Sequence, residues 1–294
     1  MPSWPLLLLS LLAVAPTAHA EIVVQDDLSQ TLHLTAPARR IVSLAPHITE
    51  NLYAAGAGGR IVGASDYSDY PQAAKRLPRV GSAASLDLEA IVALKPDLVI
   101  AWASGNPAAH LAKLRALGLP MFISQPQKIE DIATTIVRFG ELAGSTVVAT
   151  AAARAILARQ AELSSRYANR PKVRTFYQIW NQPLATIGGK QLISDVMRLC
   201  GAENVFAGLT QLAPTVSVEA VLAADPEAIV ASGMDEARPE WLDMWKRWRD
   251  LTATVRGNLF FVPPDIINRQ TPRLLDGAQI FCNHMETARS RRPG

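Results

Sequence analysis

A long stretch without glycine or proline most constrains what this chain can fold into. Neither residue occurs from residue 147 to residue 168, and alanine, leucine, arginine, glutamine and glutamate, which are strong helix formers, are frequent there. With its flanks the stretch predicts one helix of about 24 residues, about 36 Å long at 1.5 Å per residue. Pro171 marks its end. A helix of that length spans a whole domain and can serve as a rigid bridge.

Short apolar runs alternate with helical patterns on both sides of this stretch. The runs that we predict to be strands are residues 41–44, 61–64, 98–101, 121–123, 173–179, 228–231 and 259–262. Strands that alternate with helices imply parallel β-α-β units with right-handed crossovers. We therefore predict an α/β fold in which two Rossmann-like lobes, each with a parallel sheet, are joined by one long rigid α-helix.

The two halves of the chain also resemble each other. Residues 88–97 match residues 218–227 in sequence, and each segment leads into an apolar strand. Chance similarity between two helix-and-strand units is the alternative explanation. The expected organisation is a signal peptide at 1–20, an N-terminal α/β lobe at 21–143, a bridging helix at 144–170 and a C-terminal α/β lobe at 171–294.

The N-terminus has the features of a secretory signal peptide. An apolar run extends from Leu6 to Val14, and the small residues Ala18 and Ala20 precede the polar Glu21. The run is too short for a stable membrane anchor, which needs about 20 residues. No cysteine stands at the expected cleavage point to carry a lipid. We expect a periplasmic protein that is secreted, soluble and not lipid-anchored; a buried N-terminal strand or helix is the alternative.

Cys200 and Cys282 are the only cysteines of the chain. In an oxidising compartment two cysteines favour one disulfide. The bond would close a long loop, worth about 4 to 5 kcal/mol on the chain-entropy account. Two buried free thiols are the alternative.

The charge of the chain does not indicate a nucleic-acid partner. The net charge is +3, and part of the excess comes from Arg289, Arg291 and Arg292, which we expect to form a frayed C-terminal tail. No other basic run with interleaved aromatic residues occurs in the sequence. We expect a monomer that does not bind nucleic acid.

Aromatic and polar residues directly follow several predicted strands. In open α/β sheets, ligands bind outside the carboxyl ends of the strands. The candidate ligand-binding residues in such places are Tyr67, Tyr70, Trp102, Trp180, Asp265, Ile266, Ile267, Asn268 and Arg269. Aromatic faces with a few polar groups suit a large, flat ligand that is mostly uncharged, such as a corrinoid or a haem. For any single aromatic residue, packing within a lobe is the alternative.

One acidic residue occupies the same position in each repeat. Glu89 and Glu219 each lie two residues after a predicted N-cap, Asp87 and Ser217 respectively. The helix dipole favours a carboxylate in the first helical turn, which is the simpler explanation. The repeat also places one acid on each lobe, at matching sites.

The sequence contains none of the common catalytic motifs. We find no Gly-x-Ser-x-Gly, His-Glu-x-x-His, Cys-x-x-Cys or phosphate-loop pattern, and the glycine-rich residues 56–59 follow a predicted helix rather than a strand. His47 could ligate a metal, but it has no second ligand beside it. We expect no catalytic residues and no metal site. An α/β enzyme acting on a tetrapyrrole, such as a chelatase, is the alternative from another class, and it would need histidines or paired acids in the cleft.

Several motifs resemble those of the ABC-importer binding proteins whose lobes are bridged by a single long helix. They are residues 65–71, 94–102, 200–204, 271–273 and 282–283, in the same order as in that family. Within the family the chain is similar to the corrinoid-binding members. The resemblance implies a protein that captures cobalamin or a related corrinoid and delivers it to an ABC importer permease dimer. Cobalamin would then be the transported ligand, and the protein would need no cofactor and would not be an enzyme.

The resemblance also implies roles for individual residues. It implies that Tyr67 and the loop from Asp265 to Arg269 contact the corrinoid, and that Glu89 and Glu219 dock on the permease. Ala83 and Ala213 stand where a corrinoid-binding relative has tryptophans. Haem or another iron complex is therefore the alternative ligand within the same class.

Overall fold

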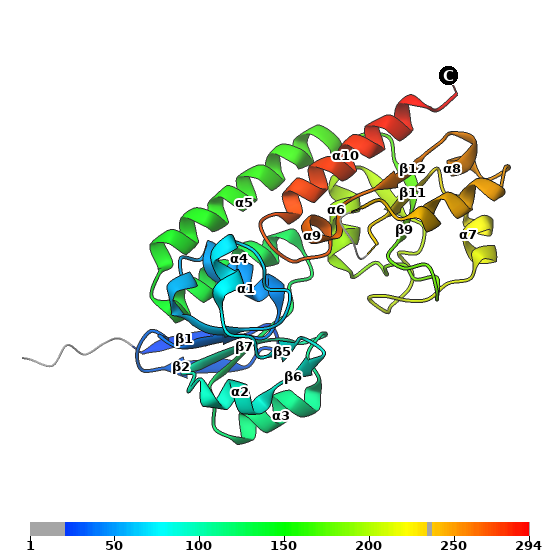
Figure 1. The fold of residues 1–294 in the computed structure, drawn as a ribbon. Coiled ribbons are helices and arrows are strands. Elements are labelled where there is room, and N and C mark those ends of the chain that lie inside the picture. The colour runs from blue at the N-terminus through cyan, green and yellow to red at the C-terminus, as the bar shows by residue number, and fades with distance from the viewer. Residues whose placement is uncertain (1–20, 234–236, 294) are drawn as a thin grey trace, which may run out of the picture.

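Two parallel β-sheets, one toward each end of a long helix, organise the protein (Figure 1). The computed structural model describes residues 21–233 and 237–293, so the expected signal peptide lies outside the described residues. The N-terminal sheet contains, in spatial order, β4 (Ile61–Ala64), β3 (Ile41–Ser43), β7 (Leu98–Trp102) and β8 (Met121–Ser124). The C-terminal sheet contains β10 (Ala202–Asn204), β9 (Val173–Gln178), β11 (Ala228–Ala231) and β12 (Leu259–Phe261).

The two sheets have the same topology. All neighbouring strands in both are parallel, and in each the second strand lies outside the first, while the third and fourth follow on the other side. The strand order therefore reverses at the same place in both lobes, between the first and the third strand. The predicted α/β class with two parallel-sheet lobes is confirmed.

Helices cover both faces of each sheet because side chains along a strand alternate between the faces. On one face of the N-terminal sheet, Ile41 and Ile100 pack against α1 (Pro46–Ala54) and α4 (Ile129–Ala143). On the other face the core includes α2 (Leu88–Ala93) and α3 (Ala108–Ala116). The C-terminal sheet is covered likewise, by α6 (Leu192–Leu199) and α10 (Leu274–Ser290) on one face and by α7 (Val218–Ala224) and α8 (Thr252–Val255) on the other.

The bridging helix is α5 (Thr146–Tyr167), which lies within the segment predicted to form it. It packs closely along α4 and also contacts α6 and α10. Its buried residues lie on one side: Ala149, Ala153, Ile156, Leu163 and Tyr167. Because these side chains belong to one continuous hydrophobic core that includes residues of both sheets, α5 holds the two lobes as parts of one packed body.

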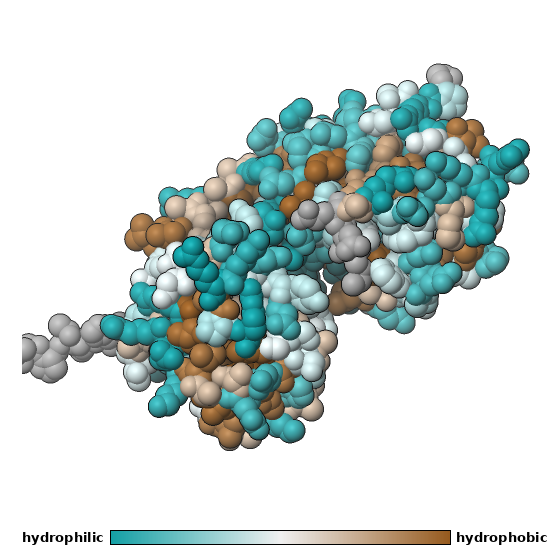
Figure 2. Space-filling view, in the orientation of Figure 1, coloured by the Kyte–Doolittle hydropathy of each residue, from teal (hydrophilic) through white to brown (hydrophobic). Residues whose placement is uncertain are grey.

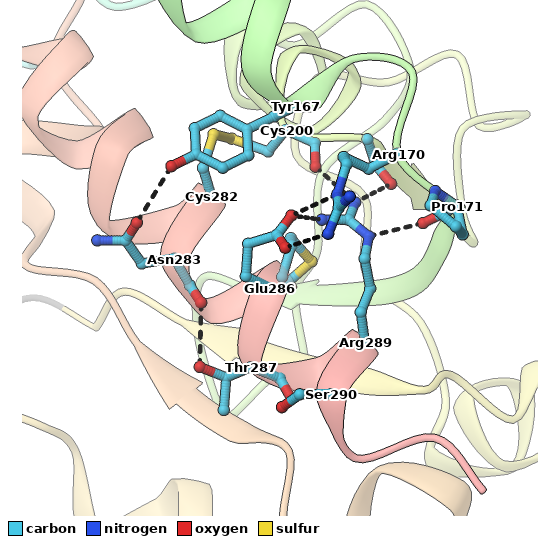
Figure 3. A network of polar contacts seen from close by, with 12 residues as sticks. Tyr167, Arg170, Pro171, Cys200, Cys282, Asn283, Glu286, Thr287, Arg289 and Ser290 are labelled. Atoms are coloured by element: carbon cyan, nitrogen blue, oxygen red, sulfur yellow. Dashed lines mark hydrogen bonds and ion pairs between the residues drawn. A yellow bond between two sulfur atoms is a disulfide. The ribbon is translucent and has the colours of Figure 1, made fainter. Parts of the chain in front are cut away.

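The predicted disulfide is present and ties α10 to the end of α6. Cys200 and Cys282 are bonded, their Cα atoms are 4.7 Å apart, and both side chains are fully buried. Beside the bond, Arg289 donates hydrogen bonds to the carbonyls of Cys200 (2.8 Å) and Pro171 (2.8 Å) and forms an ion pair with Glu286 (2.6 Å; Figure 3).

The C-terminal arginines are ordered, so the prediction of a frayed basic tail is wrong. Arg292 donates to both carboxylate oxygens of Glu227 (2.8 and 2.9 Å), and Arg291 donates to the carbonyl of Gly257 (2.7 Å). These contacts hold the end of α10 against the C-terminal lobe.

Short elements were missed by the sequence analysis. They are the antiparallel hairpin of β1 (Ile22–Gln25) and β2 (Thr31–Leu34), the small pair of β5 (Gly81–Ser82) and β6 (Ser85–Leu86), β10, α8, α9 (Pro264–Ile267) and the 3₁₀ helices Gly58–Arg60 and Gln72–Arg76. Residues Glu240–Arg247 form a further 3₁₀ helix. Within the two described ranges, no helix combines the length and apolarity that crossing a membrane requires.

Replacing Cys200 and Cys282 together by alanine should lower the free energy of unfolding by about 3 to 5 kcal/mol, because the bond restricts a long loop in the unfolded chain. Urea unfolding of the two proteins measures the difference. Mass analysis of protein purified from the periplasm, after thiol blocking without reductant, should show no alkylated cysteine, because both cysteines are bonded. Two alkylated cysteines in that native protein would contradict the account.

Candidate ligand-binding site

A cavity of about 350 Å³ lies between the two lobes. Its N-terminal wall consists of Trp102, Ser104, Gln125, Pro126 and Gln127, and its C-terminal wall of Ile179, Ile187, Lys190, Gln191, Leu192, Ile193, Leu212, Ala213, Asn268 and Gln270. Several of these residues directly follow the carboxyl ends of β7, β8 and β9. The cavity therefore lies where open α/β sheets bind ligands. Figure 2 shows a notch between the lobes on the face drawn.

Trp102 is the predicted aromatic residue that reaches the cavity, and the local structure fixes its indole. A Cβ atom on residue 105 would lie 1.8 Å from the ring, so only glycine permits this packing. Asn106 accepts a hydrogen bond from the backbone N–H of Trp102 (2.7 Å) and donates one to the carbonyl of Ala83 (2.9 Å). The buried side-chain amide of Asn106 therefore holds the backbone of Trp102 at the end of β7, and this fixes where its indole lies.

Tyr67 and Trp180 lie outside the cavity lining and expose their rings. Tyr67 follows β4 and is 76% exposed, with a left-handed backbone (φ 62°). Trp180 follows β9 and is 40% exposed, and its indole N–H donates to the carbonyl of Gln182 (2.8 Å). Both residues follow the carboxyl ends of strands, the edge of each sheet that faces the cavity, and each belongs to a different lobe.

The loop from Asp265 to Arg269 contributes one side chain, Asn268, to the cavity. It begins with the short helix α9, which directs Ile267 into the hydrophobic core, where it is 1% exposed, and leaves Ile266 half-buried. Asp265 forms an ion pair with Arg269 (3.0 Å). Ile267 can support the loop in this arrangement but does not line the cavity.

Arg269 and Arg273 converge on acidic residues of the other lobe. Glu50 on α1 has a side chain that is only 3% exposed, and it receives hydrogen bonds from Arg269 (3.2 Å) and from two nitrogens of Arg273 (2.8 and 2.6 Å). Asp69 also pairs with Arg269 (2.8 Å). We call Glu50, Asp69, Asp265, Arg269 and Arg273 the interlobe ion cluster.

The electrostatics around Asp69 favour its ionised form. Burial by itself would raise the pKa of Asp69, but the hydrogen bond and positive charge of Arg269 outweigh it and hold that pKa below its usual value. Sequence reasoning did not find Glu50, Asp69 or Arg273 as site residues. The contacts join positions about two hundred residues apart, and no local pattern in a sequence marks such a pair.

His47 lies buried between the cluster and Trp102. Its ring meets the indole of Trp102 edge-on at a centroid distance of 5.2 Å. Burial, helped by the positive charge of Arg269, lowers the pKa of His47 to about 3. His47 is therefore neutral near pH 7. Among the described residues there is no group of three or more histidine, cysteine, aspartate or glutamate side chains placed to hold a metal ion.

Glu89 and Glu219 are both exposed, in the first turns of α2 and α7. The helices begin alike, with Asp87 and Ser217 each accepting a hydrogen bond from the backbone N–H three residues on (2.9 and 3.2 Å). The pKa of Glu219 is lowered because its own backbone N–H and the Ser217 hydroxyl hydrogen-bond to it. In Figure 1, α2 and α7 lie on the side of the molecule away from α5.

The two helices also end alike. Arg40 donates to the carbonyl of Leu94 at the end of α2 (2.6 Å), and Arg174 donates to the carbonyl of Ala224 at the end of α7 (2.6 Å). The similarity noticed in the sequence therefore extends to the contacts that hold each acid-bearing helix to its lobe.

Comparisons with known proteins agree with this geometry. A family model described as "Periplasmic binding protein" matches residues 41–266. A vitamin B12-binding protein of Vibrio campbellii is 39% identical over 257 residues, which cover 87% of this chain and 92% of that protein. The crystal structure of a periplasmic vitamin B12 binding protein of Vibrio cholerae has a TM-score of 0.79 and 37% identity, covering 86% and 98% of the two chains. The crystal structure of a periplasmic heme binding protein of Pseudomonas aeruginosa has a TM-score of 0.72 and 25% identity. The match covers 83% of this chain and 91% of that one.

The buried His47 should make the protein less stable in acid. The histidine takes up a proton near pH 6.5 in the unfolded chain but not until about pH 3 in the folded one. Stability is therefore lost as pH falls below 6.5, by up to about 1.4 kcal/mol for each pH unit. Urea unfolding at pH 7.5 and pH 5 should show a smaller loss for His47→Asn than for the unsubstituted protein. His33→Asn, at an exposed site, is the control. Equal losses in all three proteins would contradict the assignment.

Proposed function

The chain belongs to the periplasmic binding protein family, and from this premise we propose that it captures cobalamin or a related corrinoid and delivers it to an ABC importer. The observation that carries the proposal is the 39% identity to a vitamin B12-binding protein over 87% of the chain. Members of this family bind their ligands and do not transform them. Cobalamin is accordingly cargo and not a cofactor.

The chemistry of the cavity supports a large ligand with uncharged polar edges. Trp102 offers an aromatic face, and the amides of Gln125, Gln127, Asn268 and Gln270 offer donors and acceptors without charge. A corrin ring is flat and carries amide side chains around its edge. Aromatic walls with a few placed amides match that combination of apolar face and polar rim.

The size of the cavity limits how much of the ligand it can enclose. Pockets for drug-sized molecules measure about 300 to 1,000 Å³, and a corrinoid is larger than such a molecule. A cavity of about 350 Å³ holds only part of it. We infer that the rest lies against the rim, where the exposed rings of Tyr67 and Trp180 extend the aromatic surface. Ala213 in the wall leaves room that a larger side chain would fill.

Haem is the second candidate ligand. It is favoured by the similarity to the Pseudomonas heme binding protein and by the exposed hydroxyl-bearing ring of Tyr67. His47 is less suited to hold a haem iron because its side chain is buried.

The transport role also requires export and docking. We propose that residues 1–20 direct the chain to the periplasm as a soluble monomer without a lipid anchor. We also propose that lobes 21–143 and 171–294 are joined by the bridging segment 144–170.

The exposed Glu89 and Glu219, one on each lobe, would each meet a basic pocket on one subunit of the permease dimer. Their matching helix starts and ends support this proposal.

Cyanocobalamin should bind with submicromolar affinity, because the cavity and rim offer an aromatic and amide surface of the right kind. Isothermal calorimetry with cyanocobalamin and with haemin measures both affinities, and the visible spectrum of each titration checks them. No heat with cyanocobalamin together with tight binding of haemin would transfer the assignment to the haem alternative.

Replacing Glu89 and Glu219 together by lysine should weaken binding to the permease by at least about tenfold, since charge-assisted contacts would be lost at both lobes. Affinity for the ligand should not change, because neither residue lines the cavity. The control is Glu162→Lys with Glu203→Lys, at two other exposed sites. Normal uptake by the correctly exported Glu89/Glu219 variant would leave these residues with the helix-dipole role alone.

A further inference from the structure

Glu50 lies at the junction of the lobes and outside the lining of the main cavity. It belongs to α1 of the N-terminal lobe, and both of its ion-pair partners, Arg269 and Arg273, come from the C-terminal segment between α9 and α10. Its side chain is 3% exposed. A buried carboxylate is costly unless it is paired and hydrogen-bonded, and the three hydrogen bonds from the two arginines supply this compensation.

The two arginines depend on Glu50 to different degrees. Arg269 has carboxylate partners besides Glu50, namely Asp69 and Asp265. Arg273 pairs with Glu50 alone among the described residues. Its guanidinium also lies over the ring of Tyr70 at 4.0 Å. Without the Glu50 charge, the half-buried guanidinium of Arg273 would have no carboxylate partner. Arg273 therefore depends on Glu50 more than Arg269 does.

The same segment is fixed at further points that lead to the cavity. Asn51, next to Glu50, donates from its amide to the carbonyl of Gln270 (2.8 Å). Gln270 and Asn268 line the cavity from the C-terminal side. One turn earlier on α1, His47 meets Trp102, which lines the cavity from the N-terminal side. Helix α1 therefore contacts both walls of the cavity. Among the described residues, every ion pair of Glu50 is with an arginine of the opposite lobe.

We propose that Glu50 is a positioning residue that sets the relative orientation of the two lobes and thereby the shape of the ligand cavity. The carboxylate holds Arg273 through two hydrogen bonds, which restrict direction as well as distance. Within the described part of the chain, loss of the charge leaves the segment 268–273 tied to α1 only through the hydrogen bond from Asn51 to the carbonyl of Gln270, and so lets the lobes take a wider range of orientations. Only the expected effect on ligand affinity rests on the proposed function.

Pulsed electron paramagnetic resonance on the ligand-free full chain tests the orientation directly. Spin labels on Leu117→Cys and Val255→Cys, exposed sites on different lobes, report the interlobe distance, and the native cysteines are bonded and do not react. Glu50→Gln should broaden the distance distribution or shift its maximum. Asp276→Asn, which removes an exposed ion pair with Arg159 between α10 and α5, should leave it unchanged.

A distribution for Glu50→Gln that matches the unsubstituted protein would overturn the proposal, because a residue that merely adds stability alters the melting temperature and not the interlobe distance. Should Glu50→Gln not fold, Glu50→Asp keeps the charge on a shorter side chain that cannot reach both arginines equally. It should still broaden the distribution, and an unchanged width there would overturn the proposal as well.

The affinity for cyanocobalamin provides the second readout. Mutations that act through a coupled junction change binding by about 2- to 30-fold, and we expect a loss of about tenfold for Glu50→Gln with less than about twofold for Asp276→Asn. If the unsubstituted protein binds no cyanocobalamin, the proposed ligand is wrong, while the distance measurement still decides the role of Glu50. Unchanged cyanocobalamin affinity in Glu50→Gln would contradict the link to cavity shape.

Discussion

Helix α5 packs against both lobes, and the place of the cavity depends on this contact. Small side chains such as Ala149 and Ala153 let α4 approach one half of the helix closely, while Leu163 and Tyr167 belong to the same core as α6 and α10. With the lobes held on one helix, the carboxyl ends of both sheets contribute to a common space. The interlobe ion cluster is a further tie between the lobes, and the disulfide between α6 and α10 fixes two helices of the C-terminal lobe against each other.

Local patterns in the sequence were sufficient for the large elements of the fold. The absence of glycine and proline from 147 to 168 predicts α5, and apolar runs such as 61–64 and 228–231 coincide with β4 and β11. The sequence repeat predicts two related lobes, and the two sheets do share one strand order. Short elements such as β10 were missed because three residues carry too little pattern. The C-terminal end of α10 was misjudged because Arg289 is held by carbonyls that lie far away in the sequence.

The candidate site was predictable only in part. The rule that ligands bind at strand ends directs attention to Trp102, which lines the cavity, and to Tyr67 and Trp180, which lie outside its lining with exposed rings. It does not reveal that α9 turns Ile267 into the core, nor that Arg269 is engaged by acids of the other lobe. Those outcomes depend on tertiary contacts between distant parts of the chain. The amides that supply polar groups to the cavity, such as Gln125 and Gln270, likewise have no recognisable motif around them.

We propose that the ligand is held between the lobes, at the carboxyl ends of the two sheets, by walls whose positions the junction fixes. A crystal structure of the protein with cyanocobalamin tests it most directly. The corrin ring should lie against Trp102 and Asn268, with its remaining surface toward Tyr67 and Trp180 and with the pair between Glu50 and Arg273 intact. A corrinoid bound elsewhere on the molecule, or bound between lobes whose ion cluster has separated, would contradict it.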